Sequence, residues 1–342
     1  MVNDEITIAQ NERFLLQKEY LGENKPINQI QPIVSVTVAT YQHVNYIRKC
    51  LDGILMQKTN FPYEIILGED GSVDGTQEIC KEYAEKYPDK IRLFIRDRKL
   101  SQYIGKNGKV TRFNGIWNRM SSRGKYIAWC EGDDYWIEPL KLQRQVDFLE
   151  SHQDYSMCFH NAFKLYMQRG KVELFNNKCC DEDLSVHDAI HDWIVPTASI
   201  LVRKDVAVNY PKWLARIYSG DYSLILLSIN AGKVRYINEI MSVYRINETG
   251  TSATAAMKHC SSFVLKQQEL LLDSFNKGTE GRYKDEIEKR IDWLKREIKF
   301  NEAKEKHNIY LIICMPKVVI SKVIGKFKSR FKILFFNSLW YL

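Results

Sequence analysis

Apolar positions along the chain follow two spacings that alternate. Short β-branched and apolar runs predict buried strands, and apolar residues at three- and four-residue steps predict amphipathic helices. The strands predicted in the N-terminal half are 33–39, 63–67, 91–95 and 126–130. Between them lie predicted helices over 47–55, 76–87 and 111–122. Because strands alternate with helices, the sequence predicts βαβ units, an α/β fold and a mostly parallel central sheet flanked by helices.

The flanking parts of the chain have other patterns. Residues 1–31 are a polar lead with one helical stretch over 8–21. The segment after 130 mixes strand signals at 157–167, 195–202 and 234–237 with predicted helices over 140–149 and 222–230. Residues 258–306 have a purely helical pattern, and Ile287, Ile291, Leu294 and Ile298 share one face. This pattern predicts a C-terminal helical extension.

Charge is concentrated at the C-terminal end. The chain has 342 residues and a formal net charge of +8. Residues 309–342 contain six of its lysines and arginines and no acid, which leaves +8 − 6 = +2 for the preceding 308 residues. A net charge of only +2 on these 308 residues, called the body below, argues against a nucleic-acid partner.

The basic segment 309–342 also has helical periodicity. Apolar residues share one face, and the basic residues occupy the rest of the circumference. The apolar set is Ile320, Val323, Ile324, Phe327, Phe331 and Leu334. This pattern is typical of a helix that lies in a membrane interface, and the lysines interrupt it too often for it to span. The alternative is a helix docked on the body with a solvated basic face.

Cysteine usage and the N-terminus favour a reducing compartment. The eight cysteines form no Cys-x-x-Cys pair, so we expect neither a zinc site nor a disulfide framework. The first residues are polar and no apolar run approaches about 18 residues, so we expect no signal peptide and no spanning helix. We therefore expect a cytoplasmic protein that is peripheral on the inner face of the membrane. The seven histidines show no evident ligand spacing, and none is given a role.

A cluster of acids follows the fourth predicted strand. Glu131, Asp133 and Asp134 come directly after an apolar run that ends at Cys130. Neighbouring carboxylates repel one another, and a hard divalent cation with oxygen ligands offsets that repulsion. The carboxyl ends of strands are also where open α/β sheets bind ligands. The segment therefore predicts a metal-diphosphate site, with the alternative that Asp134 only caps the next helix.

Two more polar groups are predicted at the same edge of the sheet. Thr40 and Tyr41 end the first strand, and Glu69 and Asp70 end the second, at the start of a turn rich in Asp and Gly. A carboxylate there can accept hydrogen bonds from a base N–H or a ribose hydroxyl. The alternative is a turn stabilised by local side-chain hydrogen bonds.

The order of these motifs resembles glycosyltransferase family 2 of the bacterial surface-polysaccharide type, which has the GT-A nucleotide-sugar fold. The motifs are Val36–Tyr41, Glu69–Thr76, Glu131–Asp134, Gly220-Asp221 and Tyr244-Arg245. The resemblance covers about residues 32–255. It implies a GT-A catalytic domain over 32–255. The sequence pattern of the other residues predicts a polar lead over 1–31, a helical extension over 256–308 and the basic amphipathic tail over 309–342.

The resemblance also implies roles for individual residues. Asp133 would bind Mg²⁺ or Mn²⁺, and Asp221 would be the general base. Residues expected to contact the nucleotide sugar are Thr40, Tyr41, Glu69, Asp70, Arg112, Glu131, Asp134 and Arg245. The family usually has Asp where this chain has Glu69 and Glu131, and it often has a His near Asn247. For Lys106 and Lys109, in the loop before the fourth strand, a solvated position is favoured over a phosphate contact.

The implied activity is the metal-dependent, inverting transfer of a hexosyl or N-acetylhexosaminyl group. The donor would be a nucleotide sugar, expected to be UDP-linked, and the acceptor a hydroxyl of a saccharide or lipid-linked saccharide. Two alternatives stay open. A nucleotidyltransferase also combines an α/β sheet with acidic metal ligands, and a carbohydrate-binding protein needs no catalytic acids.

Overall fold

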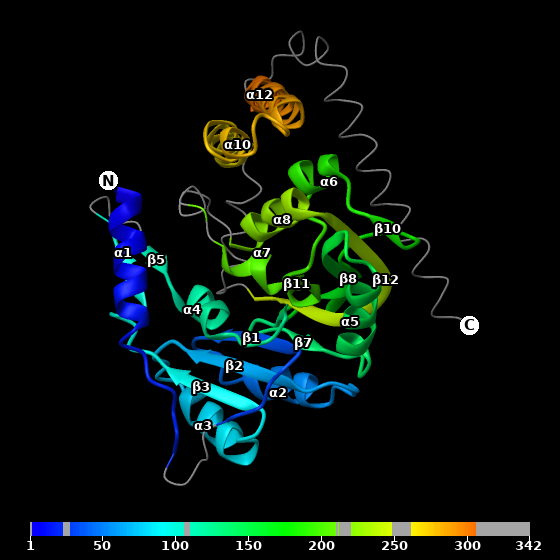
Figure 1. Ribbon diagram of the computed structural model, residues 1–342. Coiled ribbons are helices and arrows are strands. Elements are labelled where there is room, and N and C mark those ends of the chain that lie inside the picture. Colours follow the sequence, from blue (N-terminus) through cyan, green and yellow to red (C-terminus); the bar gives the residue numbers. More distant parts are fainter. Residues whose placement is uncertain are drawn as a thin grey trace. The chain divides into compact units, whose positions relative to one another are not determined.

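The computed structural model describes residues 2–22, 28–105, 110–209, 211, 220–247 and 261–305. The chain divides into two compact units, residues 1–253 and 254–342 (Figure 1). Each unit is described by itself below. Residues 306–342, which include the predicted amphipathic tail, lie outside the described residues, as do Lys106 and Lys109.

One half of the central sheet in the first unit is parallel. Its strands are β1 (Val34–Thr40), β2 (Tyr63–Glu69), β3 (Ile91–Ile95) and β6 (Tyr126–Trp129), in the order β6-β1-β2-β3. All three neighbouring pairs are parallel. This half confirms the predicted βαβ units, and it brings the carboxyl ends of all four strands to one edge of the sheet.

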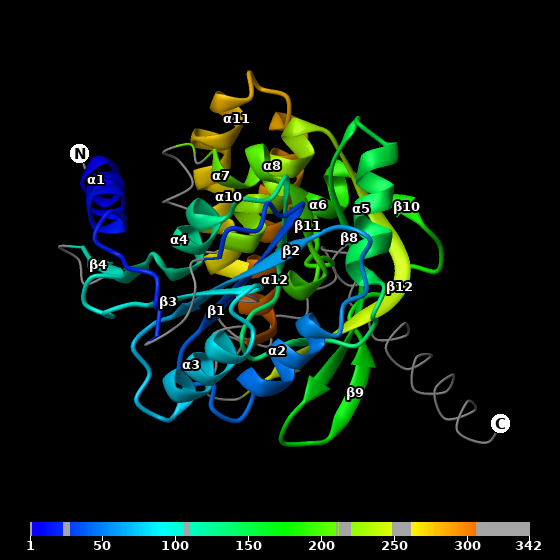
Figure 2. The same cartoon turned by 60° about the horizontal axis from the view of Figure 1, so that its bottom comes forward.

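The other half of the sheet is mixed. Strand β11 (Leu201–Arg203) is antiparallel to both β6 and β8 (Tyr155–Tyr166). The long strand β12 (Lys233–Ile246) runs parallel to β8, and β9 (Lys171–Leu174) pairs with the last part of β8 as a hairpin (Figure 2). The short strands β7 (Tyr135–Trp136) and β10 (Glu182–Asp183) both pair with β12.

Helices cover both faces of this sheet (Figure 1). One core cluster packs α2 (Ile47–Leu55), α3 (Thr76–Lys86) and α5 (Lys141–Ser151) against the sheet. The opposite face carries α4 (Asn114–Ser121), α6 (Val186–His191), α7 (Lys204–Val208) and α8 (Gly220–Ala231). Strand β6 shows why helices cover both faces. Its residues Tyr126 and Ala128 pack into the core cluster on one face, whereas Ile127 and Trp129 pack into a second core cluster on the other face. This alternation is the two-residue period of a strand buried on both faces.

Three predicted elements differ from the structure. The helix predicted over 111–122 is preceded by a hairpin of β4 (Gln102–Ile104) and β5 (Val110–Arg112), so α4 begins only at Asn114. The strand predicted over 195–202 is divided into a 3₁₀ turn, η1 (Thr197–Ser199), and β11. Helix α1 (Val2–Phe14) ends before the predicted 21, and Glu19, within the predicted helix, instead forms a β-bridge with Phe94.

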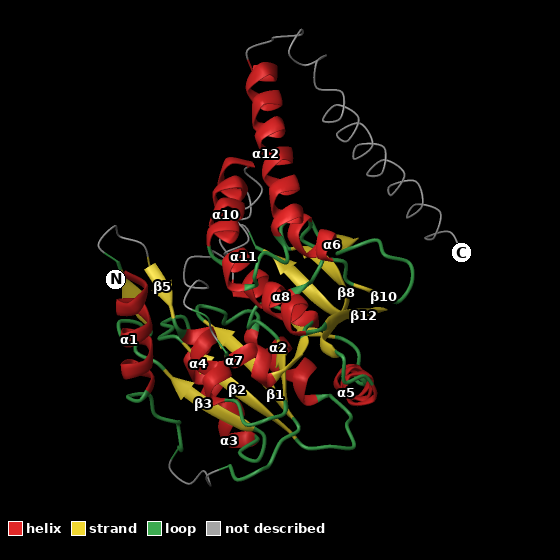
Figure 3. Ribbon diagram, turned by 45° about the horizontal axis from the view of Figure 1, so that its top comes forward, coloured by secondary structure: helices red, strands yellow, loops and turns green. Residues whose placement is uncertain are grey.

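The second unit is helical among its described residues (Figure 3). Its helices are α10 (Ser261–Asp273), α11 (Phe275–Gly278) and α12 (Lys284–Glu305). Glu280 and Gly281 have φ values of 55° and 82°, a left-handed conformation that ends α11 and reverses the chain. Helices α10 and α12 pack together, and the predicted face of α12 is buried at Ile287, Ile291 and Leu294. Within the described ranges, no helix has the length and apolarity needed to cross a bilayer.

Candidate active site

The acidic turn after β6 is pressed against the end of β1. The amide of Cys130 donates to the carbonyl of Thr37 (3.1 Å), and that of Gly132 donates to the carbonyl of Ala39 (3.0 Å). A Cβ on Gly132 would lie 2.7 Å from Thr40 Oγ1 and 2.8 Å from His43 Nδ1. Glycine is therefore required at this position, and the carboxylates on either side of it are held beside the predicted nucleotide edge.

Arg245 holds this turn from β12. Its Nη1 donates to the backbone carbonyl of Asp133 (2.6 Å), and its backbone N–H donates to Asp134 Oδ1 (2.8 Å). The guanidinium carbon lies 4.4 Å from the ring centroid of Tyr135 and 5.2 Å from that of Tyr46. With 5% of its surface exposed, Arg245 supports the turn that carries Asp133. Its predicted contact with the nucleotide sugar stays a prediction.

Asp134 is the deepest acid of the turn, with 1% of its surface exposed. Its Oδ1 accepts from Arg245, whereas its Oδ2 accepts no hydrogen bond from the described residues. Burial and the charge of Asp133 raise the pKa of Asp134 well above its usual range. The alternative that Asp134 caps the next helix is wrong, because Leu140 is the N-cap of α5, and the N–H groups of Leu140 and Leu142 donate to the side chains of Glu138 and Gln57.

Asp221 lies in the first turn of α8. The hydroxyl of Thr197 donates to Asp221 Oδ2 (3.0 Å), and the backbone N–H of Tyr222 donates to Asp221 Oδ1 (3.0 Å). Burial and the charges of Asp133 and Asp221 raise the pKa of Glu131 to about 8. The acidic turn and Asp221, nearly 90 residues apart in sequence, therefore share one electrostatic neighbourhood.

Glu69 shapes the turn that follows β2. Its carboxylate accepts from the backbone N–H groups of Ser72 (2.7 Å) and Gly71 (3.1 Å) and from Gln77 Nε2 (3.0 Å). Its side chain is fully buried. These contacts match the alternative of a turn stabilised by local hydrogen bonds. A contact between Glu69 and a base stays a prediction.

Asp70 forms a second polar cluster with residues that the sequence analysis did not identify. Its Oδ2 pairs with Arg98 Nη1 (2.8 Å), and its Oδ1 accepts from the hydroxyl of Ser101. The guanidinium carbon of Arg98 lies 3.4 Å from the ring centroid of the predicted Tyr41. Burial raises the pKa of Asp70, and the Ser101 hydrogen bond and the charges of Arg98, Arg96 and Arg112 oppose that rise. The exposed Arg112 on β5 is thus near enough to act on Asp70.

The loop after β1 is fixed by the turn after β2. The backbone N–H groups of Gln42, His43 and Val44 donate to the side chains of Ser72 (2.9 Å), Thr76 (2.8 Å) and Asp74 (3.1 Å). His43 was given no role from the sequence, yet its Nδ1 lies 3.3 Å from Thr40 Oγ1 at the centre of the site. Burial lowers the pKa of His43, although the charges of Asp133 and Asp74 oppose this effect.

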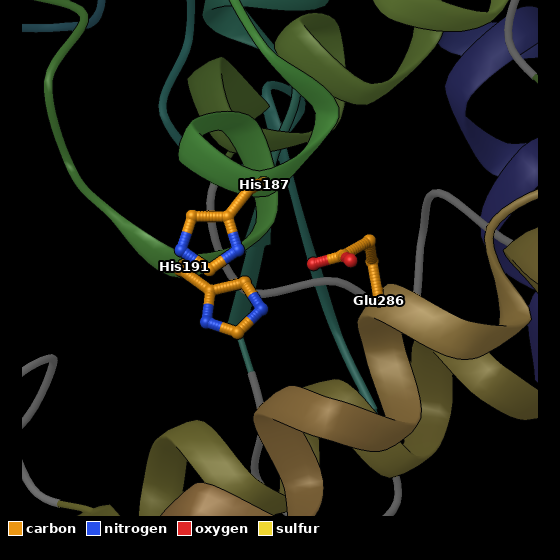
Figure 4. A group of neighbouring side chains, drawn as sticks. All are labelled: His187, His191 and Glu286. Atoms are coloured by element: carbon orange, nitrogen blue, oxygen red, sulfur yellow. The ribbon is translucent and has the colours of Figure 1, made fainter.

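Another pair of histidines shows a spacing that the sequence analysis overlooked. His187 and His191 lie one turn apart on α6, and their rings stack with centroids 4.0 Å apart (Figure 4). The statement that the histidines show no ligand spacing is therefore wrong for this pair. Glu286, the third side chain in that view, belongs to the second unit and is not placed relative to the pair.

Family comparison identifies the domain that carries this site. The family model described as "Glycosyl transferase family 2" matches residues 35–208, just over half of the chain. The chain belongs to glycosyl transferase family 2. That range includes the acidic turn, the Asp70 cluster and Thr197, whereas Asp221 and Arg245 follow it.

Curated relatives support the family. An uncharacterised protein of Mycobacterium tuberculosis is 33% identical over 217 residues, which cover 64% of this chain and 60% of the relative's length. TuaG of Bacillus subtilis, named for a role in teichuronic acid biosynthesis, is 24% identical over 65% of this chain and 82% of its own length. The chain thus spans less than two thirds of the mycobacterial relative.

Solved structures of the same architecture show that the fold is GT-A. The Staphylococcus aureus protein TarS, residues 1–349 in complex with UDP-GlcNAc, has a TM-score of 0.52 and 16% identity over 71% of this chain and 66% of that one. A Pyrobaculum calidifontis mannosyltransferase in complex with GDP-Man and Mn²⁺ has a TM-score of 0.52 and 13% identity over 96% of this chain and 93% of that one. At these identities the likeness concerns the fold.

Proposed function

We propose that this family 2 protein is a metal-dependent, inverting glycosyltransferase. It would move a hexosyl or N-acetylhexosaminyl group from a UDP-linked sugar to a hydroxyl of a saccharide or lipid-linked saccharide. The observation that supports the proposal is the position of the acidic turn, which backbone hydrogen bonds to Thr37 and Ala39 hold at the carboxyl end of the sheet. Asp221 lies near enough to this turn to help raise the pKa of Glu131. A site with these acids on one side and the Asp70 cluster on the other can hold both ends of a nucleotide sugar.

The residues of the acidic turn fit a hard divalent cation. Carboxylate oxygens are the preferred ligands of Mg²⁺ and Mn²⁺, and Asp133 is the half-buried acid of the turn whose position Arg245 fixes. When bound, the cation would act as a Lewis acid on the diphosphate leaving group. Glu131, beside it, would contact the ribose or a water.

Asp221 would accept the proton of the acceptor hydroxyl. The acceptor oxygen attacks the anomeric carbon, the bond from that carbon to the diphosphate oxygen breaks, and the proton passes to the Asp221 carboxylate. A single displacement of this kind inverts the anomeric configuration. A hydroxyl is a weak nucleophile near neutral pH, and a positioned base contributes about 10²–10⁴-fold to the rate.

The Asp70 cluster would bind the nucleoside. Tyr41 offers a ring, Arg98 a planar cation above it, and Asp70 a carboxylate at the same edge of the sheet. Such groups suit a base and ribose. The name of TuaG, a putative teichuronic acid biosynthesis glycosyltransferase, supports a role in surface polysaccharide biosynthesis. The proposed place on the inner face of the membrane rests on the pattern of the basic tail.

Hydrolysis of nucleotide sugars without acceptor tests the activity. We expect slow release of UDP from at least one UDP-sugar in a panel with Mn²⁺ or Mg²⁺, and loss of that release in EDTA. Release of pyrophosphate would instead indicate a nucleotidyltransferase, and binding without turnover a carbohydrate-binding protein. Asp133→Asn should abolish metal-dependent donor binding while the thermal unfolding temperature stays unchanged.

The base is tested separately. Asp221→Asn should lower turnover by roughly 10² or more while the affinity for the donor stays close to that of the wild type. Loss of nucleotide binding with turnover intact would place Asp221 in the donor site instead.

A further inference from the structure

The 3₁₀ turn η1 lies between the acidic turn and Asp221, and buried groups hold it from several directions. The indole Nε1 of Trp136 donates to the carbonyl of Ala198 (2.8 Å), and Gln145 Nε2 donates to that of Ser199 (2.8 Å). The Ser199 hydroxyl donates to the carbonyl of Pro196 (2.6 Å) and closes the turn on itself. All of these donor side chains are buried. The turn is therefore a rigid platform, since an unmade hydrogen bond at a buried group costs about 1–3 kcal/mol.

One side chain of this platform reaches the acid proposed as the base. Thr197 Oγ1 donates to Asp221 Oδ2, while the backbone of α8 donates to Asp221 Oδ1. The two donors come from separate elements and approach different oxygens. Together the two donors hold the plane of the carboxylate at the start of α8.

The platform also connects Asp221 to the acidic turn. Trp136 follows Asp133 and Asp134 by two to three residues, and its indole is the donor that holds η1. The path from the proposed metal ligand to the base therefore runs through β7, the indole and Thr197. Each step of this path is a direct hydrogen bond or a short stretch of backbone.

We propose that Thr197 is a positioning residue for Asp221. Its hydroxyl holds the carboxylate in the orientation from which it takes the acceptor proton, and it ties that orientation to the platform shared with the acidic turn. This inference rests on the proposed role of Asp221 as general base. Thr197 itself takes no part in proton transfer. Because small misplacement of a reacting group can reduce rates by up to about 10²-fold, loss of the hydroxyl should affect turnover.

The test uses Thr197→Val, which keeps the shape of the side chain and removes the hydroxyl, and Thr197→Ser, which keeps the hydroxyl. The reaction is the metal-dependent hydrolysis of the nucleotide sugar that the wild type hydrolyses fastest. We expect kcat of Thr197→Val to fall about tenfold, with KM and the Kd for UDP with Mn²⁺ within about twofold of wild type. Thr197→Ser should restore kcat to within about threefold. Thr197→Ala, with the same expected loss, replaces Thr197→Val if the valine variant does not fold.

A double-mutant cycle separates positioning from a general structural effect. In an Asp221→Asn background, Thr197→Val should cause no further loss of kcat. Full activity of Thr197→Val, or the same tenfold loss in both backgrounds, would overturn the inference and leave the proposed function standing. If Asp221→Asn alone retains turnover, the proposed base is wrong and the inference falls with it.

Discussion

Lys141 begins α5 with its whole side chain buried. Its Nζ donates to Gln145 Oε1 (2.7 Å) and lies 3.9 Å from the ring centroid of Trp136. No carboxylate is among its recorded partners in the described part of the chain, and burial lowers the pKa of Lys141 to about 7. The residue therefore approaches neutrality in the folded protein near physiological pH. The charged form of Lys141 is disfavoured, because burying an ammonium group without a counter-ion costs free energy.

Lys141→Met should stabilise the protein, and the gain should depend on pH. Between pH 7 and the ordinary lysine pKa of 10.5, the unfolded chain binds a proton that the folded chain lacks. The free energy of unfolding of the wild type therefore rises with pH across this window. The variant lacks this dependence, so its advantage should shrink by about 1 kcal/mol per pH unit from pH 7 to 9 in urea titrations.

The exposed Lys58→Met variant is the matched control and should follow the wild type at every pH. If Lys141→Met also keeps the same difference from wild type at each pH, Lys141 is charged in the folded protein.

Arg98 is the second residue whose environment leads to a prediction. It covers the ring of Tyr41 and is paired with the nearly buried Asp70, so its removal disrupts both groups. Arg98→Ala should weaken UDP binding about tenfold in calorimetry and change kcat little at saturating donor, because its contacts lie at the proposed nucleoside end of the site. Arg48→Ala removes an exposed arginine paired with Glu82 and is the control. Equal UDP affinities in both variants would contradict the nucleoside role of the Asp70 cluster.

At the scale of elements, the first half of the sheet follows directly from local sequence. Strands β1, β2, β3 and β6 are rich in apolar and β-branched residues because both of their faces are buried, so the positions of Thr40, Glu69 and Glu131 at one edge could be predicted. Only the first part of the long strand β12, residues 234–237, was predicted, because its burial pattern is irregular and it pairs over a bulged register. The support that Arg245 gives to the acidic turn depends on that strand.

The groups that sequence reasoning missed come from elements that it misassigned or from loops. Arg98 and Ser101 lie between β3 and the unpredicted hairpin, and Thr197 lies in a 3₁₀ turn predicted as strand. A basic run directly after β3, at the edge already assigned to the nucleotide, was the available signal for Arg98. No signal in the sequence indicated Thr197, since only its hydrogen bond to Asp221 of α8 distinguishes it from other polar residues.

The link between β12 and the acidic turn gives a prediction about metal binding. Arg245→Met removes the donor to the carbonyl of Asp133 while the backbone contact to Asp134 remains possible. Loss of a group that orients a metal ligand typically costs 10–100-fold in metal affinity. We therefore expect Mn²⁺ binding, measured by electron paramagnetic resonance with UDP present, to weaken about tenfold or more.

Two further variants show whether this effect belongs to Arg245. Arg245→Lys should lie between wild type and Arg245→Met, since an ammonium can still donate to one carbonyl. Arg144→Met, which breaks the more exposed ion pair with Glu239, should bind Mn²⁺ like the wild type. A normal Mn²⁺ affinity in Arg245→Met, combined with weaker UDP binding, would favour the predicted contact of Arg245 with the nucleotide sugar.

At the scale of the whole molecule, the first unit gathers its site from segments that are distant in sequence. The loop after β1, the turns after β2 and β6, η1, the start of α8 and the end of β12 all contribute. Only the global topology brings such segments together. A single sequence therefore predicts that acids lie at strand ends better than it predicts the contacts between those segments. The family resemblance supplied Asp221, whose local sequence alone indicates a helix start.

The basic tail gives the last prediction, which rests on sequence periodicity because residues 306–342 lie outside the described residues. Its apolar face and surrounding lysines predict binding to anionic membranes, where each cation near the surface contributes about 1 kcal/mol. The full chain should float with vesicles containing anionic lipid at low salt, and a chain ending at Asn308 should not. Phe327→Ser with Phe331→Ser should reduce flotation while the charge is unchanged. If the full and shortened chains both stay unbound, the tail is a structural element and the membrane prediction is wrong.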